Sequence, residues 1–155
     1  DKGAKRNNLS FYRQILFNEF ESRECFYCGK KLRGDGIQVD HFIPWSYVAH
    51  DELWNLMPMD SSLNSSKSNR LPKWDPFFHR FARNQFIMYQ LIHEKEGIRK
   101  LYESCYRDNL HSLWAGQELY RKGNSEAEFM NILQKNMQPV YDSARRQGYE
   151  VWNRG

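Results

Sequence analysis

The stretch from Asp40 to Lys67 holds five polar residues whose types could together hydrolyse a phosphodiester bond. That reaction needs a water nucleophile, neutralisation of charge on the phosphate, and help for the departing oxygen. The neutral imidazole of His41 can take a proton from water at neutral pH. A divalent ion can supply most of the rest, and Asp40 and Asn64 carry the oxygens that such an ion prefers. Asn55 lies between these residues, and Lys67, one helical turn beyond Asn64, could contact a phosphate.

Asp40 and His41 are neighbours at the end of an apolar, β-prone run, in the stretch "VDHFIPWS". Neighbouring side chains on a strand point to opposite faces, so the pair predicts a division of roles, with Asp40 toward a metal and His41 toward the attacking water. The simpler alternative is a polar strand end with a core histidine, which is the commoner explanation of a lone His. We prefer the catalytic interpretation because Asn55, Asn64 and Lys67 follow within the same short stretch.

Short elements must position these residues. "RGDG", residues 33–36, predicts the turn between two short strands, and "NLMPM", residues 55–59, predicts another strand that its proline assigns to a sheet edge. A helix capped by Asp60 or Ser61 would then carry Asn64 and Lys67 on one face. The expected unit is therefore strand, loop, strand and helix.

Three linked motifs in this unit, "DHFIPWS", "LWNLMPM" and "LNSSKSN", resemble those of the HNH endonucleases of the ββα-metal class. Asn55 follows His41 by 14 residues and Asn64 follows Asn55 by 9. These offsets are similar to those in the HNH domains of RNA-guided CRISPR effectors and of restriction and phage-defence nucleases. The resemblance covers roughly residues 25 to 72.

The resemblance implies a role for each motif residue. Asp40 and Asn64 would be the metal ligands, and His41 the general base. Asn55 would tie down the loop and help to orient the His41 ring. An amide oxygen at position 64 favours Mg²⁺ or Mn²⁺ over Zn²⁺ or Ni²⁺. The implied reaction is single-metal strand cleavage that leaves 5′-phosphate and 3′-hydroxyl ends.

The stretch "CFYCG" contains half of a zinc site, Cys25 and Cys28. Many HNH proteins complete this site with a second Cys pair just before the last motif residue. Asp60 and Leu63 occupy those two positions here, and structural zinc prefers four Cys or His ligands. We therefore expect no structural Zn²⁺ at these cysteines, and a tight turn held by packing instead.

Charge is distributed unevenly around the motif. Residues 34–66 contain five carboxylates and no Lys or Arg, whereas residues 67–83 contain five Lys and Arg against one Asp. An acidic pocket beside a basic strip suits a metal site next to a polyanion, although a solvated helix face would have the same composition. Lys67 and Arg70 lie nearest the motif, and we expect them to contact the nucleic-acid backbone.

Two further residue types near the motif have an ordinary structural interpretation. Trp45 and Trp54 flank it and could stack on bases, but we expect them to anchor the core of a short, glycine-rich unit. His50 lies in the loop near the active site and is kept open as a phosphate contact.

The remaining sequence has apolar residues at helical spacing. Residues 9–20 predict an amphipathic helix, and four apolar stripes follow over residues 77–92, 98–105, 110–120 and 130–144, the last interrupted by Pro139. The expected fold is α+β, a small ββα-metal HNH core embedded in a mostly α-helical domain. Its parts would be an N-terminal helix in residues 1–24, the nuclease motif in residues 25–72 and a helical C-terminal region in residues 73–155.

The composition indicates where in the cell this domain is expected. No apolar run approaches the ~20 residues of a membrane span, and three cysteines do not suit a secreted disulfide framework, so we expect a cytoplasmic protein without a membrane partner. The chain begins without Met, which suggests a piece of a longer protein with a fused sensor or target-recognition domain, in restriction or antiviral defence. We expect DNA rather than RNA as the substrate. The alternatives are a catalytically inactive HNH-like nucleic-acid-binding module and a redox or zinc-regulatory domain built on the two cysteines.

Overall fold

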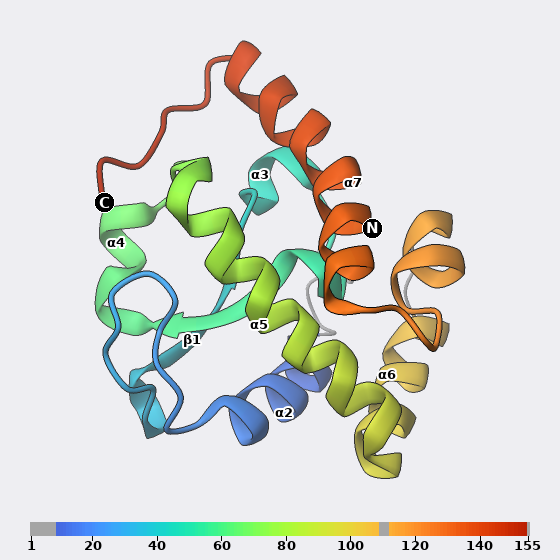
Figure 1. Cartoon of the computed structure of the whole chain (residues 1–155). Coiled ribbons are helices and arrows are strands. Elements are labelled where there is room, and N and C mark those ends of the chain that lie inside the picture. Colours follow the sequence, from blue (N-terminus) through green and yellow to red (C-terminus); the bar gives the residue numbers. More distant parts are fainter. Residues whose placement is uncertain (1–8, 109–111, 155) are drawn as a thin grey trace.

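Strands β1, Ile37–His41, and β2, Leu56–Asp60, pair antiparallel at the centre of the computed structural model, which describes residues 9–108 and 112–154 (Figure 1). In their register His41 lies opposite Leu56 and Asp40 opposite Met57. Pro58 does not interrupt β2, because each strand of a two-stranded sheet has one edge with no hydrogen-bonded neighbour. The register places the chemically interesting end of β1 beside the beginning of β2.

A short helical segment follows β2 and completes the ββα unit. It consists of a 3₁₀ turn, η4 (Ser61–Leu63), and a single α-helical turn, α4 (Asn64–Lys67). The Asp60 carboxylate caps the segment by accepting a hydrogen bond from the backbone N–H of Ser62. The helix ends after Lys67, where Ser68 adopts a positive φ of 47°.

Helices surround this unit and make up most of the fold, so the expected α+β class is confirmed (Figure 1). The long helix α5 crosses over the strands and packs against α6 and α7, and α2 contacts both strands and α6. The bounds of the helices are α2 Leu9–Phe20, α3 Trp45–Val48, α5 Trp74–Glu94, α6 Glu96–Asp108 and α7 Glu126–Arg146, and those of the 3₁₀ turns in the loops are η2 Gly34–Gly36 and η3 Leu53–Asn55.

The turn at residues 33–36 differs from its prediction. It is the 3₁₀ turn η2 that leads into β1, and the segment before it contains only the isolated bridge between Glu24 and Lys31 in place of a strand. The reason is a tight turn in which the backbone N–H of Gly29 bonds to the carbonyl of Cys25 at 2.8 Å, with Gly29 at φ 80°. The two paired strands are therefore joined by the long loop that contains α3.

The predicted apolar stripe over residues 110–120 is wrong at Leu113, whose side chain is 73% exposed. Leu110 lies outside the described residues. The segment Ala115–Leu119, η5, has π-helical geometry and buries Ala115 and Leu119. A π turn contains more residues than an α turn, so the three- and four-residue spacing does not keep Leu113 on the buried side.

Pro139 does not interrupt α7, contrary to the prediction. The helix runs through it from Glu126 to Arg146. Pro139 lies on an exposed face, where water can bond the backbone carbonyl that the missing N–H leaves without a partner. A capping box between Ser125 and Glu128 fixes the start of this helix.

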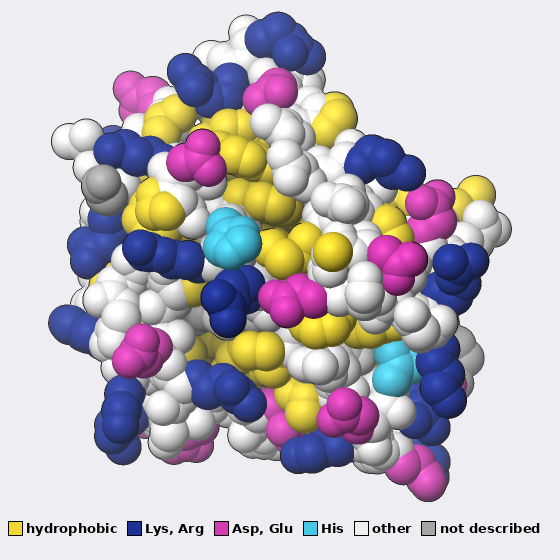
Figure 2. Space-filling view, viewed as in Figure 1, with side chains coloured by type: hydrophobic (Ala, Val, Ile, Leu, Met, Phe, Trp, Pro, Cys, Tyr) yellow, Lys and Arg dark blue, Asp and Glu magenta, His cyan; other side chains and the backbone are white. Residues whose placement is uncertain are grey.

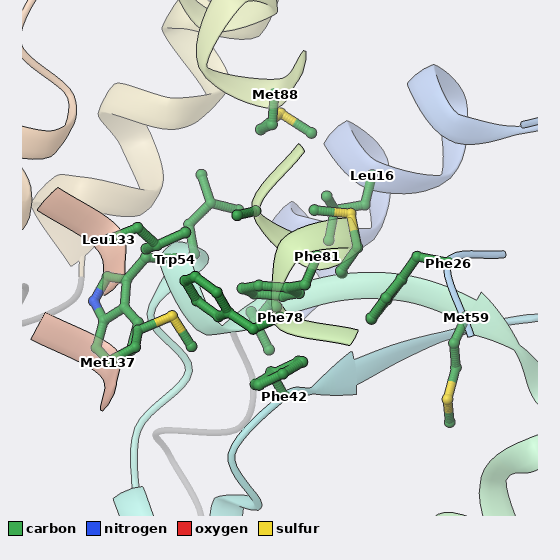
Figure 3. Packing of buried hydrophobic residues seen from close by; sticks show 14 of the residues in the cluster. Leu16, Phe26, Phe42, Trp54, Met59, Phe78, Phe81, Met88, Leu133 and Met137 are labelled. Carbon is green, nitrogen blue, oxygen red and sulfur yellow. The ribbon is translucent and has the colours of Figure 1, made fainter. Parts of the chain in front are cut away.

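The core lies between α5 and the strand pair and is rich in aromatic rings (Figure 3). The ring centroids of Phe42 and Phe81 are 4.6 Å apart, and Phe26 lies 5.7 Å from Phe81. Figure 3 shows Leu16 of α2 on one side of this group and Leu133 and Met137 of α7 on the other. Each such buried side chain contributes roughly 1.5–3 kcal/mol through removal from water.

The buried amide of Gln85 connects α5 to the loop that precedes β2. Its Nε2 donates to the carbonyls of Leu53, at 3.1 Å, and Leu56, at 2.8 Å. These carbonyls flank Asn55, so α5 holds the backbone on which a predicted site residue stands. Within the described part of the chain, none of the helices has the length and apolar character needed to cross a membrane.

We predict that Gln85→Leu lowers the free energy of unfolding by about 1–3 kcal/mol, because two buried carbonyls lose their donor. Gln90→Leu is the matched control, since Gln90 is exposed on the same helix and its replacement should change stability by less than about 0.5 kcal/mol. Urea unfolding followed by circular dichroism measures both. Equal stability of the two variants would contradict the connecting role of Gln85.

Candidate active site

The carboxylate of Asp40 is buried at the end of β1 and has a partner on each oxygen. Its Oδ2 accepts a hydrogen bond from the hydroxyl of Tyr27 at 2.7 Å. Its Oδ1 lies 3.1 Å from the ammonium of Lys67. Burial raises the pKa of Tyr27 well above its usual range, and the negative charge of Asp40 raises it further, so the tyrosine stays protonated and remains a donor.

Lys67 points from α4 toward the end of β1. Its Nζ also donates to the backbone carbonyl of His41 at 2.8 Å, and its side chain is 3% exposed. The ammonium therefore joins α4 to β1 and balances the charge of Asp40. A phosphate contact by Lys67 stays a prediction, and it would require this side chain to turn outward.

His41 forms a close pair with Asp51 on the other side of the strand. His41 Nε2 lies 2.7 Å from Asp51 Oδ1, and the two side chains are 10% and 0% exposed. A carboxylate only accepts hydrogen bonds, so Nε2 carries a proton in this pair and Nδ1 is the nitrogen with a free electron pair in the neutral ring. The pair thus fixes both the orientation and the tautomer of His41.

Asn55 is fully buried and bonds to the chain just beyond His41. Its side-chain oxygen accepts from the backbone N–H of Ile43 at 3.0 Å, and its Nδ2 donates to the carbonyl of Ile43 at 2.9 Å. The backbone carbonyl of Asn55 also accepts from the N–H of Phe42 at 2.9 Å. These three bonds fasten the start of the loop to its end, so the position of His41 depends on Asn55.

Asn64 and Arg70 lie nearer the surface. Asn64 is exposed as the first residue of α4. Arg70 donates to the carbonyl of Ser66 at 3.1 Å and lies 3.5 Å from a carboxylate oxygen of Glu150. The structure thus brings Asp40, His41 and Lys67 into direct contact through side chains and backbone, whereas Asn64 is exposed at the start of α4 and Arg70 contacts Ser66 and Glu150.

Residues 25–73 match a family model described as HNH endonuclease. This segment belongs to the HNH endonuclease family. Comparisons of the chain with curated proteins and with solved structures give no match. Membership indicates nuclease activity on a nucleic acid, and HNH nucleases typically use a divalent metal ion.

The HNH segment contains two residues at the site that the sequence analysis missed, Asp51 and Tyr27. Asp51 was only counted among the acidic residues of the motif, although a buried base usually needs an orienting partner. Tyr27 lies within "CFYCG", where the two cysteines were considered and the tyrosine hydroxyl was not. The sequence contains no spacing rule that would bring either residue to the end of β1.

The oxygen donors at this end of the HNH unit are of the kind that a hard divalent ion takes. The carboxylate of Asp40 already faces a positive charge, the ammonium of Lys67 at 3.1 Å. Asn64, three residues before Lys67, offers an amide oxygen. Within residues 9–108 and 112–154, no group of three or more His, Cys, Asp and Glu side chains is placed to hold a metal. An ion here would thus rely on few protein ligands and keep several waters, as Mg²⁺ does.

The two cysteines of the HNH segment face Asp60 at the end of β2. Cys25 Sγ accepts a hydrogen bond from the backbone N–H of Asp60 at 3.4 Å, and Cys28 Sγ donates to Asp60 Oδ2 at 3.8 Å. Burial raises the pKa of the Cys25 thiol, whereas the backbone N–H of Ser62 lowers the pKa of Asp60. Asp60 thus stands at one of the two positions of the missing second Cys pair and fastens the turn that contains Cys25 and Cys28 to the strand.

The flanking aromatic and histidine residues have structural contacts. Trp54 is buried and its Nε1 donates to Glu52 at 2.6 Å, as expected of a core anchor. His50 accepts from the backbone N–H of Glu52 at 3.2 Å, and its ring lies 5.0 Å from that of Trp54. Glu52 also accepts from Ser112, so this loop is fastened to the helical region.

We predict that Asn55→Ala lowers the free energy of unfolding by about 2–4 kcal/mol, because it leaves the buried N–H and carbonyl of Ile43 without partners. Asn69→Ala, at an exposed position in the same segment, is the control and should be nearly neutral. Thermal unfolding of the three proteins provides the comparison. If Asn55→Ala is as stable as the control, the two side-chain bonds of Asn55 do not hold the loop.

Proposed function

We propose that this protein is a metal-dependent endonuclease that hydrolyses phosphodiester bonds of DNA, with His41 as the general base. The observation that carries this proposal is the pairing of His41 with Asp51 at 2.7 Å beside the buried carboxylate of Asp40. A binding module has no need for a histidine held in one tautomer. A base that must accept a proton from water does need it.

His41 would act through Nδ1. Because Nε2 is engaged by Asp51, the electron pair of Nδ1 is available to take a proton from the attacking water. The imidazolium that results would be stabilised by the carboxylate of Asp51, which lies buried against it. Asn55 contributes by holding the backbone of residues 42 and 43 and thereby the end of the strand.

Asp40 and Asn64 would hold a single Mg²⁺ or Mn²⁺ ion. When bound, such an ion polarises the phosphate and stabilises the departing oxygen. Asp40 offers the buried carboxylate, and Lys67 keeps that carboxylate neutralised before an ion arrives. A bound ion would compete with the ammonium for Oδ1, and Lys67, once displaced, would be near enough to contact the phosphate.

DNA as the substrate follows from the resemblance of the motifs to those of restriction, phage-defence and CRISPR-effector nucleases. HNH units hold mainly the backbone, and sequence reading comes from attached domains. We therefore place the protein in restriction or antiviral defence and expect it to take its target from a fused or associated recognition domain.

One observation favours a second candidate function, a catalytically inactive HNH-like binding module. Both oxygens of Asp40 have protein partners, Tyr27 and Lys67. If Lys67 does not yield Oδ1 to a metal ion, the site cannot assemble. DNA binding that weakens with salt, without cleavage in any divalent ion, would be the result expected of this module.

We predict that the protein nicks or degrades supercoiled plasmid in Mg²⁺ or Mn²⁺, and that EDTA stops it. His41→Ala should slow cleavage by about 10²- to 10⁴-fold, the usual contribution of a general base, while its circular dichroism and DNA affinity stay those of the parent. His79→Ala, at an exposed position on α5, should cleave as the parent does. A His41→Ala protein that cuts at the parental rate would refute the mechanism.

We predict that Asp51→Asn slows cleavage by about 10- to 100-fold through His41. Asp35→Asn, in the exposed turn η2, is the control with the same charge change and should have no effect. A second measurement separates positioning from general damage. ¹⁵N NMR of the His41 ring should show mainly the Nε2–H tautomer in the parent and a larger Nδ1–H fraction in Asp51→Asn. An unchanged tautomer with unchanged rate would show that Asp51 has no positioning role.

A further inference from the structure

We propose that a basic groove on the α4 side of the molecule binds the sugar–phosphate backbone of the DNA that the active site cleaves. The groove is about 1590 Å³ in volume. Its walls come from four segments, namely the cysteine turn at residues 22–31, α4 with Arg70, the first half of α5, and residues 152–154. The inference rests on the proposed nuclease function for the identity of the bound strand.

Positive charge dominates the lining of this groove. It contains one carboxylate, that of Glu24, and six cationic side chains, which are Arg23, Lys31, Arg70, Arg80, Arg83 and Arg154. The sum of these charges is therefore +5, more than the +4 of the whole chain. Figure 2 shows Lys and Arg side chains over the region that Figure 1 assigns to α4, the first half of α5 and the cysteine turn.

Most of these cations have no carboxylate of their own. Among the residues that the structure describes, only one of the six, Arg70, has a carboxylate oxygen within 4 Å. That oxygen belongs to Glu150, at 3.5 Å, and the contact is solvent-exposed. Arg80 instead lies over the ring of Phe77, at 5.6 Å from its centroid. Cations gathered without carboxylate partners repel one another, and the phosphates of a polyanion relieve that repulsion while the polyanion releases its own condensed counterions.

The shape of the lining suits a backbone that lies close to the protein. Ser65 and Ser66 of α4 present small, exposed side chains, whereas Phe77 and Trp152, which also line the groove, are almost fully buried. Trp152 Nε1 donates to the Ser66 hydroxyl at 2.8 Å, and its backbone N–H bonds to the carbonyl of Leu71. The segment that carries Arg154 is thus fastened to α4.

Tyr27 links the groove to the proposed active site. This residue lines the groove, and its hydroxyl bonds to Asp40, the proposed metal ligand. Ser65 and Ser66, on another wall, directly follow Asn64 in α4. A strand lying in the groove would therefore pass next to the residues that act on it.

The spread of the cations favours an extended sugar–phosphate backbone over a single phosphate ion as the ligand. They come from segments separated by up to 131 residues of sequence, since 154 minus 23 is 131, and all line one large, open groove. All of them except Lys31 are arginines, whose guanidinium groups bind phosphate oxygens in pairs. A repeated phosphate backbone fits this arrangement.

The test measures binding of a fluorescent DNA duplex by the parent chain in EDTA, so that binding is separated from cleavage. In the triple variant Arg80→Ala, Arg83→Ala, Arg154→Ala, we expect affinity to fall by at least about tenfold at 0.1 M salt. The slope of log affinity against log salt should shrink by about 2 to 3, close to one for each phosphate that no longer has a cationic partner. The single reversal Arg83→Glu should weaken binding in the same direction and guards against misfolding of the triple variant.

The matched control removes three cations elsewhere, Arg121→Ala, Lys122→Ala and Lys135→Ala. Residues 120 and 121 contact Tyr89 and His93, so this surface lies at the far end of α5. The control should bind with the parental affinity and nearly the parental salt slope. If the groove variants bind as tightly as this control, the groove does not hold DNA. Tighter binding of an RNA of equal length would overturn the assignment to DNA.

Plasmid cleavage by the parent chain, measured in parallel, separates this inference from the proposed function. A parent that cleaves while the groove variants bind normally would refute only the groove. A parent that never cleaves, with groove variants that lose binding, would refute the nuclease function and leave the groove as a DNA-binding surface.

Discussion

The carboxylate of Asp40 is buried, with only 6% of the side chain exposed, and its hydrogen-bond and ion-pair partners come from the segments around it. An unpaired buried charge costs several kcal/mol, so Asp40 needs both the ammonium of Lys67 and the hydroxyl of Tyr27. These partners come from α4 and from the cysteine turn. Three parts of the HNH unit are therefore held at a single charge, and the arrangement of strand, turn and helix follows from the need to neutralise it.

A second layer of contacts holds the loop between the strands, and it consists of buried amides. Asn55 bonds to the backbone beyond His41, and Gln85 of α5 bonds to the backbone on either side of Asn55. The helical region thus supports the end of β1 through polar contacts as well as through aromatic packing. This explains why a family segment of 49 residues stands within a chain of 155, since its own strands are too few to bury a core.

The elements that carry the motif could be predicted from local patterns. Alternation of side chains assigned Asp40 and His41 to opposite faces, and they do contact different partners, Lys67 and Asp51. The inward direction of Lys67 could not be predicted, because a lysine that follows two serines in a short helix is expected to be exposed. The contact of Asp51 with His41 could not be predicted either, because the position of Asp51 depends on the course of a long loop. The stripe over residues 110–120 was wrong at Leu113 because a π turn changes the spacing on which the pattern relies.

The bridge between Leu71 and Val151 has a consequence for the order in which the domain can be completed. These residues are 80 positions apart in sequence, since 151 minus 71 is 80. The motif residues are therefore synthesised long before the segment that lies against α4. A nascent chain that stops early therefore has the proposed site residues but lacks one wall of the basic groove. The proposed site and its groove are complete only when nearly all of this domain has been synthesised.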